Sequence, residues 1–142
     1  PVLWFWPNVD AGADGTSTGI RAFRENNDLS QFHFFKNMDP LDFLKLLSHS
    51  KGLIGNSSVG IRECAFLGVP VINIGTRQNR RARGNNVLDV NYSKSEILEA
   101  INQIKSNPRP DSSDVYGGGD AGIQIANLLA EVPLIFHKTI TF

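Results

Sequence analysis

The chain has 142 residues, 41% of them apolar and 20% charged, and its 14 Lys and Arg side chains balance its 14 Asp and Glu side chains. This length suits one domain with a buried core, and the zero net charge excludes a global field that would recruit nucleic acid or an anionic membrane. The single cysteine, Cys64, excludes an internal disulfide, and the three histidines lack metal-ligand spacing. No apolar run approaches the length of a membrane span, and the N-terminus has no signal-peptide pattern. We therefore expect a cytoplasmic protein without a bound metal, and the lack of an initiator Met predicts a piece of a longer chain.

Short apolar strands alternate with amphipathic helices along the sequence. Strands are predicted at residues 2–6, 31–36, 53–55, 71–74 and 87–90, and helices at residues 17–25, 40–51, 59–66, 94–106 and 120–130. This alternation is typical of α/β proteins with a parallel sheet. It predicts a Rossmann-like open sheet with helices on both faces. We expect a single domain over residues 1–142, in which residues 132–142 form a tail without usable periodicity.

The ends of several predicted helices carry capping residues. Asp39 is expected to cap the helix that begins at Pro40. Ser93 with Glu96 forms a capping box, and Gly68 is expected to end the helix over residues 59–66. Three leucines of the helix that begins at Pro40 have the spacing of one buried face: Leu41, Leu44 and Leu47.

Ligands of open parallel sheets bind beyond the carboxyl ends of the strands. That rule selects the loops at residues 8–18, 56–58 and 75–83. In the second of these, free N–H groups at a helix start bind phosphate readily. Small residues such as Gly60 let a phosphate approach the backbone, and Ser57 and Ser58 add two hydroxyl donors. The same serines are ordinary helix caps, and the segment alone favours that structural interpretation because it matches neither a Walker A motif nor GxGxxG.

Charged side chains accompany this turn. Glu63 could accept both hydroxyls of a ribose whose phosphate lies at the helix start, and a surface glutamate favoured by the helix dipole is the alternative. Residues 75–83 contain four arginines, among them Arg77, and guanidinium groups suit a pyrophosphate. A solvated basic loop and non-specific nucleic-acid contact are the alternatives, of which the second is disfavoured by zero net charge and the lack of interleaved aromatics.

Two further loops contain weaker candidates. Asn8 or Asp10 could bond a base or a sugar, although Asn, Asp and Gly form turns unaided. Tyr116, in the glycine-rich segment before the last helix, could pack against a ligand, and a linker is an equal alternative. Cys64 is expected to be a small core residue, and His33 a structural one.

The order of these features along the chain resembles the UDP-N-acetylglucosamine 2-epimerases. The resemblance covers residues 2–130 and includes residues 85–88 and the Tyr116-Gly117 loop. Its most specific parts are Pro7-Asn8-Val9-Asp10-Ala11-Gly12, Gly55-Asn56-Ser57-Ser58-Val59-Gly60-Ile61-Arg62-Glu63 and Gly68-Val69-Pro70-Val71-Ile72-Asn73-Ile74-Gly75-Thr76-Arg77-Gln78. The stretches at residues 7–12 and 75–78 favour the hydrolysing branch that supplies sialic-acid-type sugars.

This resemblance implies one half of a two-domain GT-B type fold, whose N-terminal domain and first strand of this domain lie before Pro1. It implies that the reaction eliminates UDP from the sugar and adds water to the resulting glycal, without a cofactor. The catalytic acids and bases are expected in the missing N-terminal part, so the fragment alone should be inactive, and the full-length protein is expected to be a homo-oligomer. UDP or UDP-N-acetylglucosamine would bind at Asn8, Ser57, Ser58, Glu63 and Arg77, with Asp10, Gly60 and Tyr116 as further candidates.

Two other functions stay open. The donor-binding domain of a GT-B glycosyltransferase uses the same edge of the same fold for a nucleotide sugar, so the fold alone does not decide. A non-catalytic nucleotide-binding or interaction domain is the second alternative.

Overall fold

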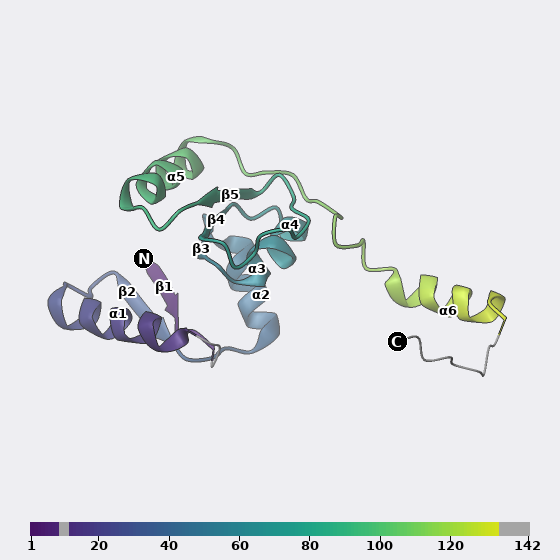
Figure 1. Cartoon of the computed structure of the whole chain (residues 1–142), viewed down its shortest axis with the longest axis horizontal. Helices are drawn as coiled ribbons and strands as arrows, with labels where there is room; N and C mark the ends of the chain where they lie inside the picture. The colour runs from purple at the N-terminus through teal and green to yellow at the C-terminus, as the bar shows by residue number, and fades with distance from the viewer. Residues whose placement is uncertain (9–11, 134–142) are drawn as a thin grey trace, which may run out of the picture. The chain divides into compact units, whose positions relative to one another are not determined.

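The computed structural model describes residues 1–8 and 12–133, which form parallel strands and helices (Figure 1). The strands are β1 (Val2–Phe5), β2 (Phe32–Phe35), β3 (Leu53–Gly55), β4 (Val71–Ile74) and β5 (Val87–Val90). The helices are α1 (Ala13–Asn26), α2 (Pro40–His49), α3 (Ser58–Ile61), α4 (Glu63–Leu67), α5 (Lys94–Ser106) and α6 (Ala121–Glu131). Every strand predicted from the sequence is present, and every strand pair is parallel. The α/β class is therefore confirmed.

The chain forms two compact units, residues 1–46 and residues 47–142. The first contains a parallel pair, β1 and β2, packed with aromatic side chains. The Trp4 ring lies 5.3 Å from Phe23 of α1 and 5.8 Å from Phe34 of β2, a spacing at which aromatic pairs add to the stability that area burial gives. That both units belong to one domain stays a prediction.

Helix α1 is longer than the sequence predicts, since it begins at Ala13 and not at residue 17. The abundance of Gly, Asp and Thr in residues 9–18 predicts a loop there. Intrinsic propensity is a weak prior that tertiary context overrides. Gly12, with φ of 86°, provides the left-handed turn that starts the helix.

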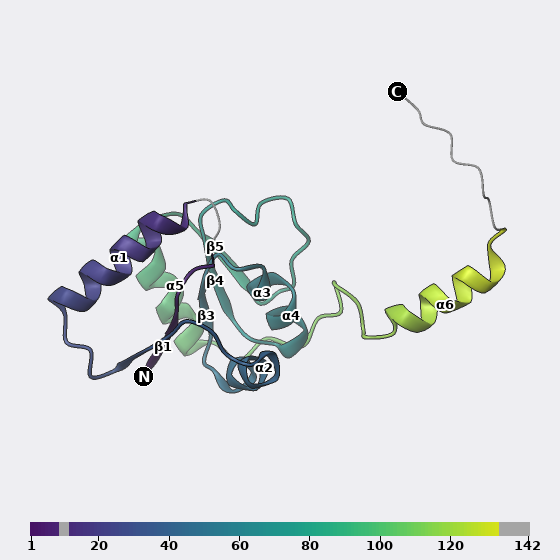
Figure 2. The same cartoon turned by 90° about the horizontal axis from the view of Figure 1, so that it is seen from below.

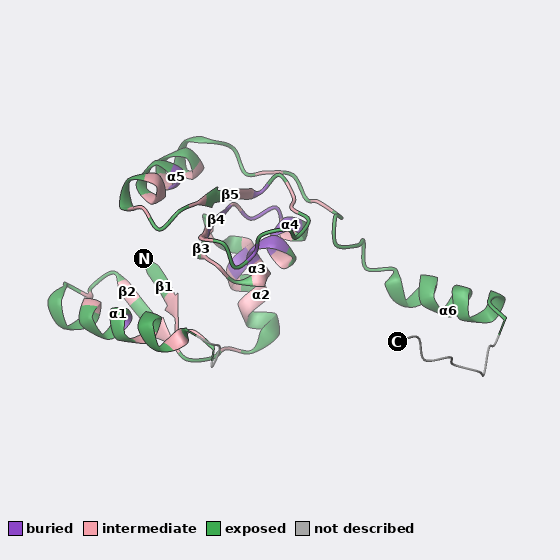
Figure 3. Ribbon diagram, viewed as in Figure 1, coloured by how far each residue is buried: buried purple, intermediate pink, exposed green. Residues whose placement is uncertain are grey.

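The second unit contains the three-stranded parallel sheet β3-β4-β5. Helices α3 and α4 lie on one side of it and α5 on the other (Figures 1 and 2). Most of the buried residues gather in α3, α4, β4 and the adjoining turns, whereas no residue of α6 is buried (Figure 3). The apolar side chains of this unit with at most 2% exposure are Ile61, Cys64, Ala65, Val69, Val71 and Ile72.

The two sheets differ from the single open sheet that the sequence predicts. β1 is hydrogen-bonded to β2, and β3 to β4, but within residues 1–8 and 12–133 no strand joins the two ladders. The alternation of strands and helices fixes the class of fold, and it does not determine which strands become neighbours.

Two of the predicted helices need correction. Asp39 caps α2 as expected, since its Oδ1 accepts from the backbone N–H of Leu41 at 2.9 Å. Leu47 is buried, but Leu41 is 68% exposed because it lies in the first turn of α2, before the part that is covered. The helix predicted over residues 59–66 is broken into α3 and α4 at Arg62, which has φ of −101° and ψ of −77°.

The capping box at the start of α5 is formed in part. Ser93 Oγ accepts from the N–H of Glu96 at 3.4 Å, as the motif requires. The Glu96 carboxylate accepts instead from the backbone N–H of Asn91 at 2.9 Å, two residues earlier than Ser93. The glutamate therefore ties α5 to the end of β5.

Candidate functional site

Two serines lie in the turn between β3 and α3. Ser57 is the N-cap of α3, and its Oγ accepts from the N–H of Val59 at 3.4 Å. Ser58 is the first helical residue and is half-buried, whereas Ser57 is exposed. Because α3 ends after four residues, its aligned peptide dipoles are few. An anion at this turn would depend mainly on the hydroxyl protons and on nearby cations.

Glu63 begins α4 with one carboxylate oxygen engaged and the other without a donor. Its Oε1 lies 3.3 Å from Arg62 Nη2. Its Oε2 is buried and has no hydrogen-bond partner among the described residues. A buried acceptor that lacks a donor costs free energy until a water or a ligand supplies one. Glu63 therefore has one carboxylate oxygen that can still accept from a hydroxyl or N–H group.

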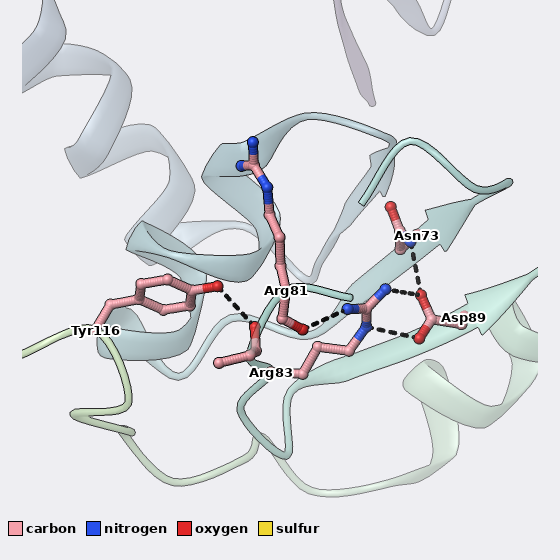
Figure 4. Close-up of polar contacts among 6 residues, drawn as sticks. Asn73, Arg81, Arg83, Asp89 and Tyr116 are labelled. Atoms are coloured by element: carbon pink, nitrogen blue, oxygen red, sulfur yellow. Dashed lines mark hydrogen bonds and ion pairs between the residues drawn. The ribbon is translucent and has the colours of Figure 1, made fainter. Parts of the chain in front are cut away.

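The loop between β4 and β5, residues 75–86, is anchored by its last arginine. Arg83 donates to both carboxylate oxygens of Asp89 in β5, through Nε at 2.7 Å and Nη2 at 3.2 Å (Figure 4). Arg83 Nη1 donates to the carbonyl of Arg81 at 2.8 Å, and the Arg81 side chain points away from Asp89. Arg77 is exposed. Arg83 therefore anchors the loop to β5.

Tyr116 contacts the same loop. Its hydroxyl donates to the carbonyl of Ala82 at 2.8 Å, across 34 positions of sequence (Figure 4). From the sequence, a ligand contact and a linker are equal alternatives for this segment. The structure shows that the segment after α5 is tied to the arginine-rich loop.

Gly60 is buried in α3, and packing accounts for its missing side chain. A Cβ at this position would lie 2.8 Å from Val71 Cγ1 and 3.4 Å from Leu53 Cδ2. The glycine lets α3 approach β3 and β4 closely. Its carbonyl also accepts from Asn86 Nδ2 at 3.2 Å.

The remaining candidates lie in the first unit. Asn8 is exposed in the segment that follows β1, at the carboxyl end of that strand. Asp10 lies outside the described residues. Glu63, the two serines and Arg77 belong to the second unit.

Buried amides near the site are not predicted by the sequence. Gln78 and Asn86 are 2% and 3% exposed, although both lie in a polar loop. Gln78 Nε2 donates to the carbonyl of Asn56 at 2.7 Å. Asn73 of β4 donates to Asp89 Oδ1 at 2.6 Å. Nothing in the local pattern distinguishes these side chains from solvated ones, because their partners lie many positions away.

Cys64 is a core residue, as expected, and is fully buried. Burial, with a smaller contribution from the charge of Glu63, raises the pKa of its thiol to about 12. Within residues 1–8 and 12–133, no group of three or more His, Cys, Asp or Glu residues could hold a metal ion. In the same part of the chain no helix has the length and apolarity to cross a membrane.

The Arg83–Asp89 pair is expected to give an acid-sensitive contribution to stability. Burial raises the pKa of Asp89, but hydrogen bonds from Arg83 and Asn73 and the Arg83 charge outweigh it, so the pKa lies below the ordinary value of 3.8. A depressed pKa contributes stability above the unfolded-state value, and this is lost as the pH falls through the folded-state value. Asp89→Asn should therefore lower the thermal midpoint near neutral pH and flatten its decline below about pH 4. The exposed Asp111→Asn is the control, and equal acid declines in wild type and Asp89→Asn would contradict the assignment.

The fold is that of an α/β protein whose polar loops follow the carboxyl ends of parallel strands, the edge at which ligands of this class bind. The family model of the UDP-N-acetylglucosamine 2-epimerases matches residues 2–130. The chain therefore belongs to the UDP-N-acetylglucosamine 2-epimerase family.

Curated relatives agree with this assignment. The chain is 34% identical over 119 residues to the UDP-N-acetylglucosamine 2-epimerase of Neisseria meningitidis serogroup B, which covers 84% of the chain and 30% of that protein. It is 32% identical over 133 residues to the UDP-N,N'-diacetylbacillosamine 2-epimerase (hydrolyzing) of Legionella pneumophila, a match that covers 94% of the chain and 34% of that protein. It is 38% identical over 100 residues to polysialic acid biosynthesis protein P7 of Escherichia coli, a match that covers 70% of the chain and 25% of that protein. The chain thus spans about a third or less of the length of these relatives.

Proposed function

We propose that this chain is the UDP-binding part of a hydrolysing UDP-N-acetylglucosamine 2-epimerase. Family membership supports a nucleotide-sugar substrate. The hydrolysing type is supported by the Legionella relative, and a role in sialic-acid-type sugar synthesis by the Escherichia coli one. The observation that carries the proposal is the buried Oε2 of Glu63, which has no donor among the described residues. Ribose hydroxyls are donors of matching chemistry, and Glu63 follows Ser58 by five residues, across the break at Arg62.

The binding roles follow from this position. Glu63 accepts from the ribose hydroxyls, while the hydroxyls of Ser57 and Ser58 donate to the diphosphate. The guanidinium of Arg77 neutralises diphosphate charge, which a planar fork of donors does well. Asn8 is proposed as a further UDP-binding residue, and Asp10, Gly60 and Tyr116 as secondary candidates. Gly60 would act through its packing, and Tyr116 through its hydrogen bond to the loop.

In the proposed reaction a base removes the proton at C2 of the sugar, and the C1–O bond breaks so that UDP leaves with its electron pair. Water then adds to C1 of the glycal, and C2 is protonated from the opposite face, which gives N-acetylmannosamine. The residues of this chain stabilise the negative charge that grows on the leaving diphosphate. The proton transfers belong to residues outside this chain, and no cofactor takes part.

We propose further that the chain is the C-terminal half of a GT-B type fold in a cytoplasmic homo-oligomer. The strand orders within the two units support the fold part of this proposal. In the common doubly wound order 3-2-1-4-5-6, the pair β1-β2 has the order of strands 2 and 3, and β3-β4-β5 that of strands 4, 5 and 6. Strand 1 would then precede β1 in the whole protein.

The reaction product tests the proposal. The full-length protein that contains this chain is incubated with UDP-N-acetylglucosamine and no acceptor. Release of N-acetylmannosamine and UDP is expected. Release of UDP and N-acetylglucosamine without N-acetylmannosamine would point to a glycosyltransferase. No consumption of the substrate together with no UDP binding would point to a non-catalytic domain. The 142-residue chain by itself is expected to give no turnover.

A further inference from the structure

Gln78 has an unusual environment for a residue of an arginine-rich loop. It is 2% exposed, whereas its neighbours Arg77 and Asn79 are exposed. Its Nε2 donates to the backbone carbonyl of Asn56 at 2.7 Å, a contact that spans 22 positions of sequence. One end of this buried amide therefore connects the loop after β4 to the turn after β3.

The residues beside this hydrogen bond are the ones proposed to bind UDP. Arg77 immediately precedes Gln78, and Ser57 immediately follows Asn56. β3 and β4 are parallel neighbours, with Gly55 beside Asn73, so both segments leave the sheet at the same edge. The Gln78–Asn56 bond fixes the distance between the arginine-bearing loop and the serine-bearing turn.

The carbonyl oxygen of the Gln78 side chain indicates that the residue does more than fill space in the core. Gln78 Oε1 is buried and has no hydrogen-bond partner among the described residues. A buried acceptor without a donor is a cost that an apolar side chain of similar size avoids. An apolar residue would fill the space at least as well, but it would leave Asn56 without this donor. What the amide adds is the hydrogen bond to the turn.

We propose that Gln78 is a positioning residue of the nucleotide site, which holds the Asn56–Ser58 turn and Arg77 in register for one diphosphate. This inference rests on the proposed function, because it takes UDP as the ligand. Gln78 acts through the backbone of Asn56 and through the loop that carries Arg77. It need not touch UDP itself.

The test uses the full-length protein, with the UDP dissociation constant from calorimetry and the thermal midpoint as readouts. Gln78→Met keeps the length and loses both polar ends. It should keep the thermal midpoint within a few degrees of the wild-type value. It should weaken UDP binding about tenfold, because the hydrogen bond that holds the turn and the loop together is lost. Asn79→Ala, an exposed change in the same loop, should leave both values unchanged. Gln78→Glu, which places an acceptor against the Asn56 carbonyl, should weaken UDP binding at least as much.

A double-mutant cycle separates positioning from general loosening of the protein. If Gln78 acts by placing Arg77, the effects of Gln78→Met and Arg77→Ala on UDP binding should be less than additive. The pair Asn79→Ala and Arg77→Ala should show no coupling. Wild-type UDP affinity in both folded Gln78 variants, full additivity in the cycle, or failure of both variants to fold would each overturn the role of Gln78. Wild-type protein that does not bind UDP would overturn the proposed function itself.

Discussion

Glu63→Gln is expected to weaken UDP binding about a hundredfold, as the loss of roughly 3 kcal/mol predicts when a carboxylate that accepts from two hydroxyls becomes an amide. Oε2 of Glu63 is the buried acceptor that a ribose hydroxyl would satisfy. The substitution preserves size, so the fold should persist. Calorimetric titration of the full-length protein with UDP measures the effect.

A change in the nucleotide tests the contact between Glu63 and the ribose more directly than a change in the protein alone. Wild type should bind UDP more tightly than 2'-deoxy-UDP, because the deoxy nucleotide offers Glu63 one hydroxyl fewer. Glu63→Ala should bind the two nucleotides about equally. Glu99→Gln, an exposed change on α5, should behave as wild type. If Glu63→Ala still discriminates between the nucleotides, another residue holds the ribose.

Gly60→Ala is expected to destabilise the protein by about 1–3 kcal/mol, the usual range for an added methyl in a tightly packed core. The new Cβ would lie 2.8 Å from Val71 Cγ1, and Val71 is itself buried. The clash separates α3 from β4 and so displaces the serine turn as well. Urea unfolding measures the change in the free energy of unfolding.

Two further variants isolate the cause. A Cβ added at Gly19 in α1 would meet nothing within 4 Å apart from the neighbouring backbone of its own helix. Gly19→Ala should therefore be neutral or stabilising, since Ala is the better helix former. Val71→Ala combined with Gly60→Ala should cost less than the sum of the single changes. Strict additivity would show that the contact with Val71 is not the source of strain.

The periodic features of the fold could be predicted from the sequence. All five strands and the cap at Asp39 follow from local patterns. The break at Arg62 could not, because Arg is itself a good helix former. The exposure of Leu41 could not either, since helical spacing shows which residues share a face and not how far along the helix that face is covered.

The candidate site, too, could be predicted only in part from the sequence. Serines, a glutamate and arginines at the carboxyl edge of a sheet could be proposed from strand order and residue chemistry. The engagement of Arg83 with Asp89, and of Gln78 with Asn56, could not, because each contact depends on how a loop folds back on its neighbours. Arg77 and Arg83 have equal standing in the local sequence, and only the three-dimensional arrangement identifies Arg83 as an anchor of the loop.

The central claim is that the turn after β3 and the loop after β4 together bind UDP. Its most direct test is a nuclear magnetic resonance titration of the 142-residue chain with UDP. Weak binding, on the order of millimolar, should shift the amide signals of residues 56–63 and 75–83 and leave those of α6 unchanged. Shifts confined to other segments, or none at saturating UDP, would contradict the claim.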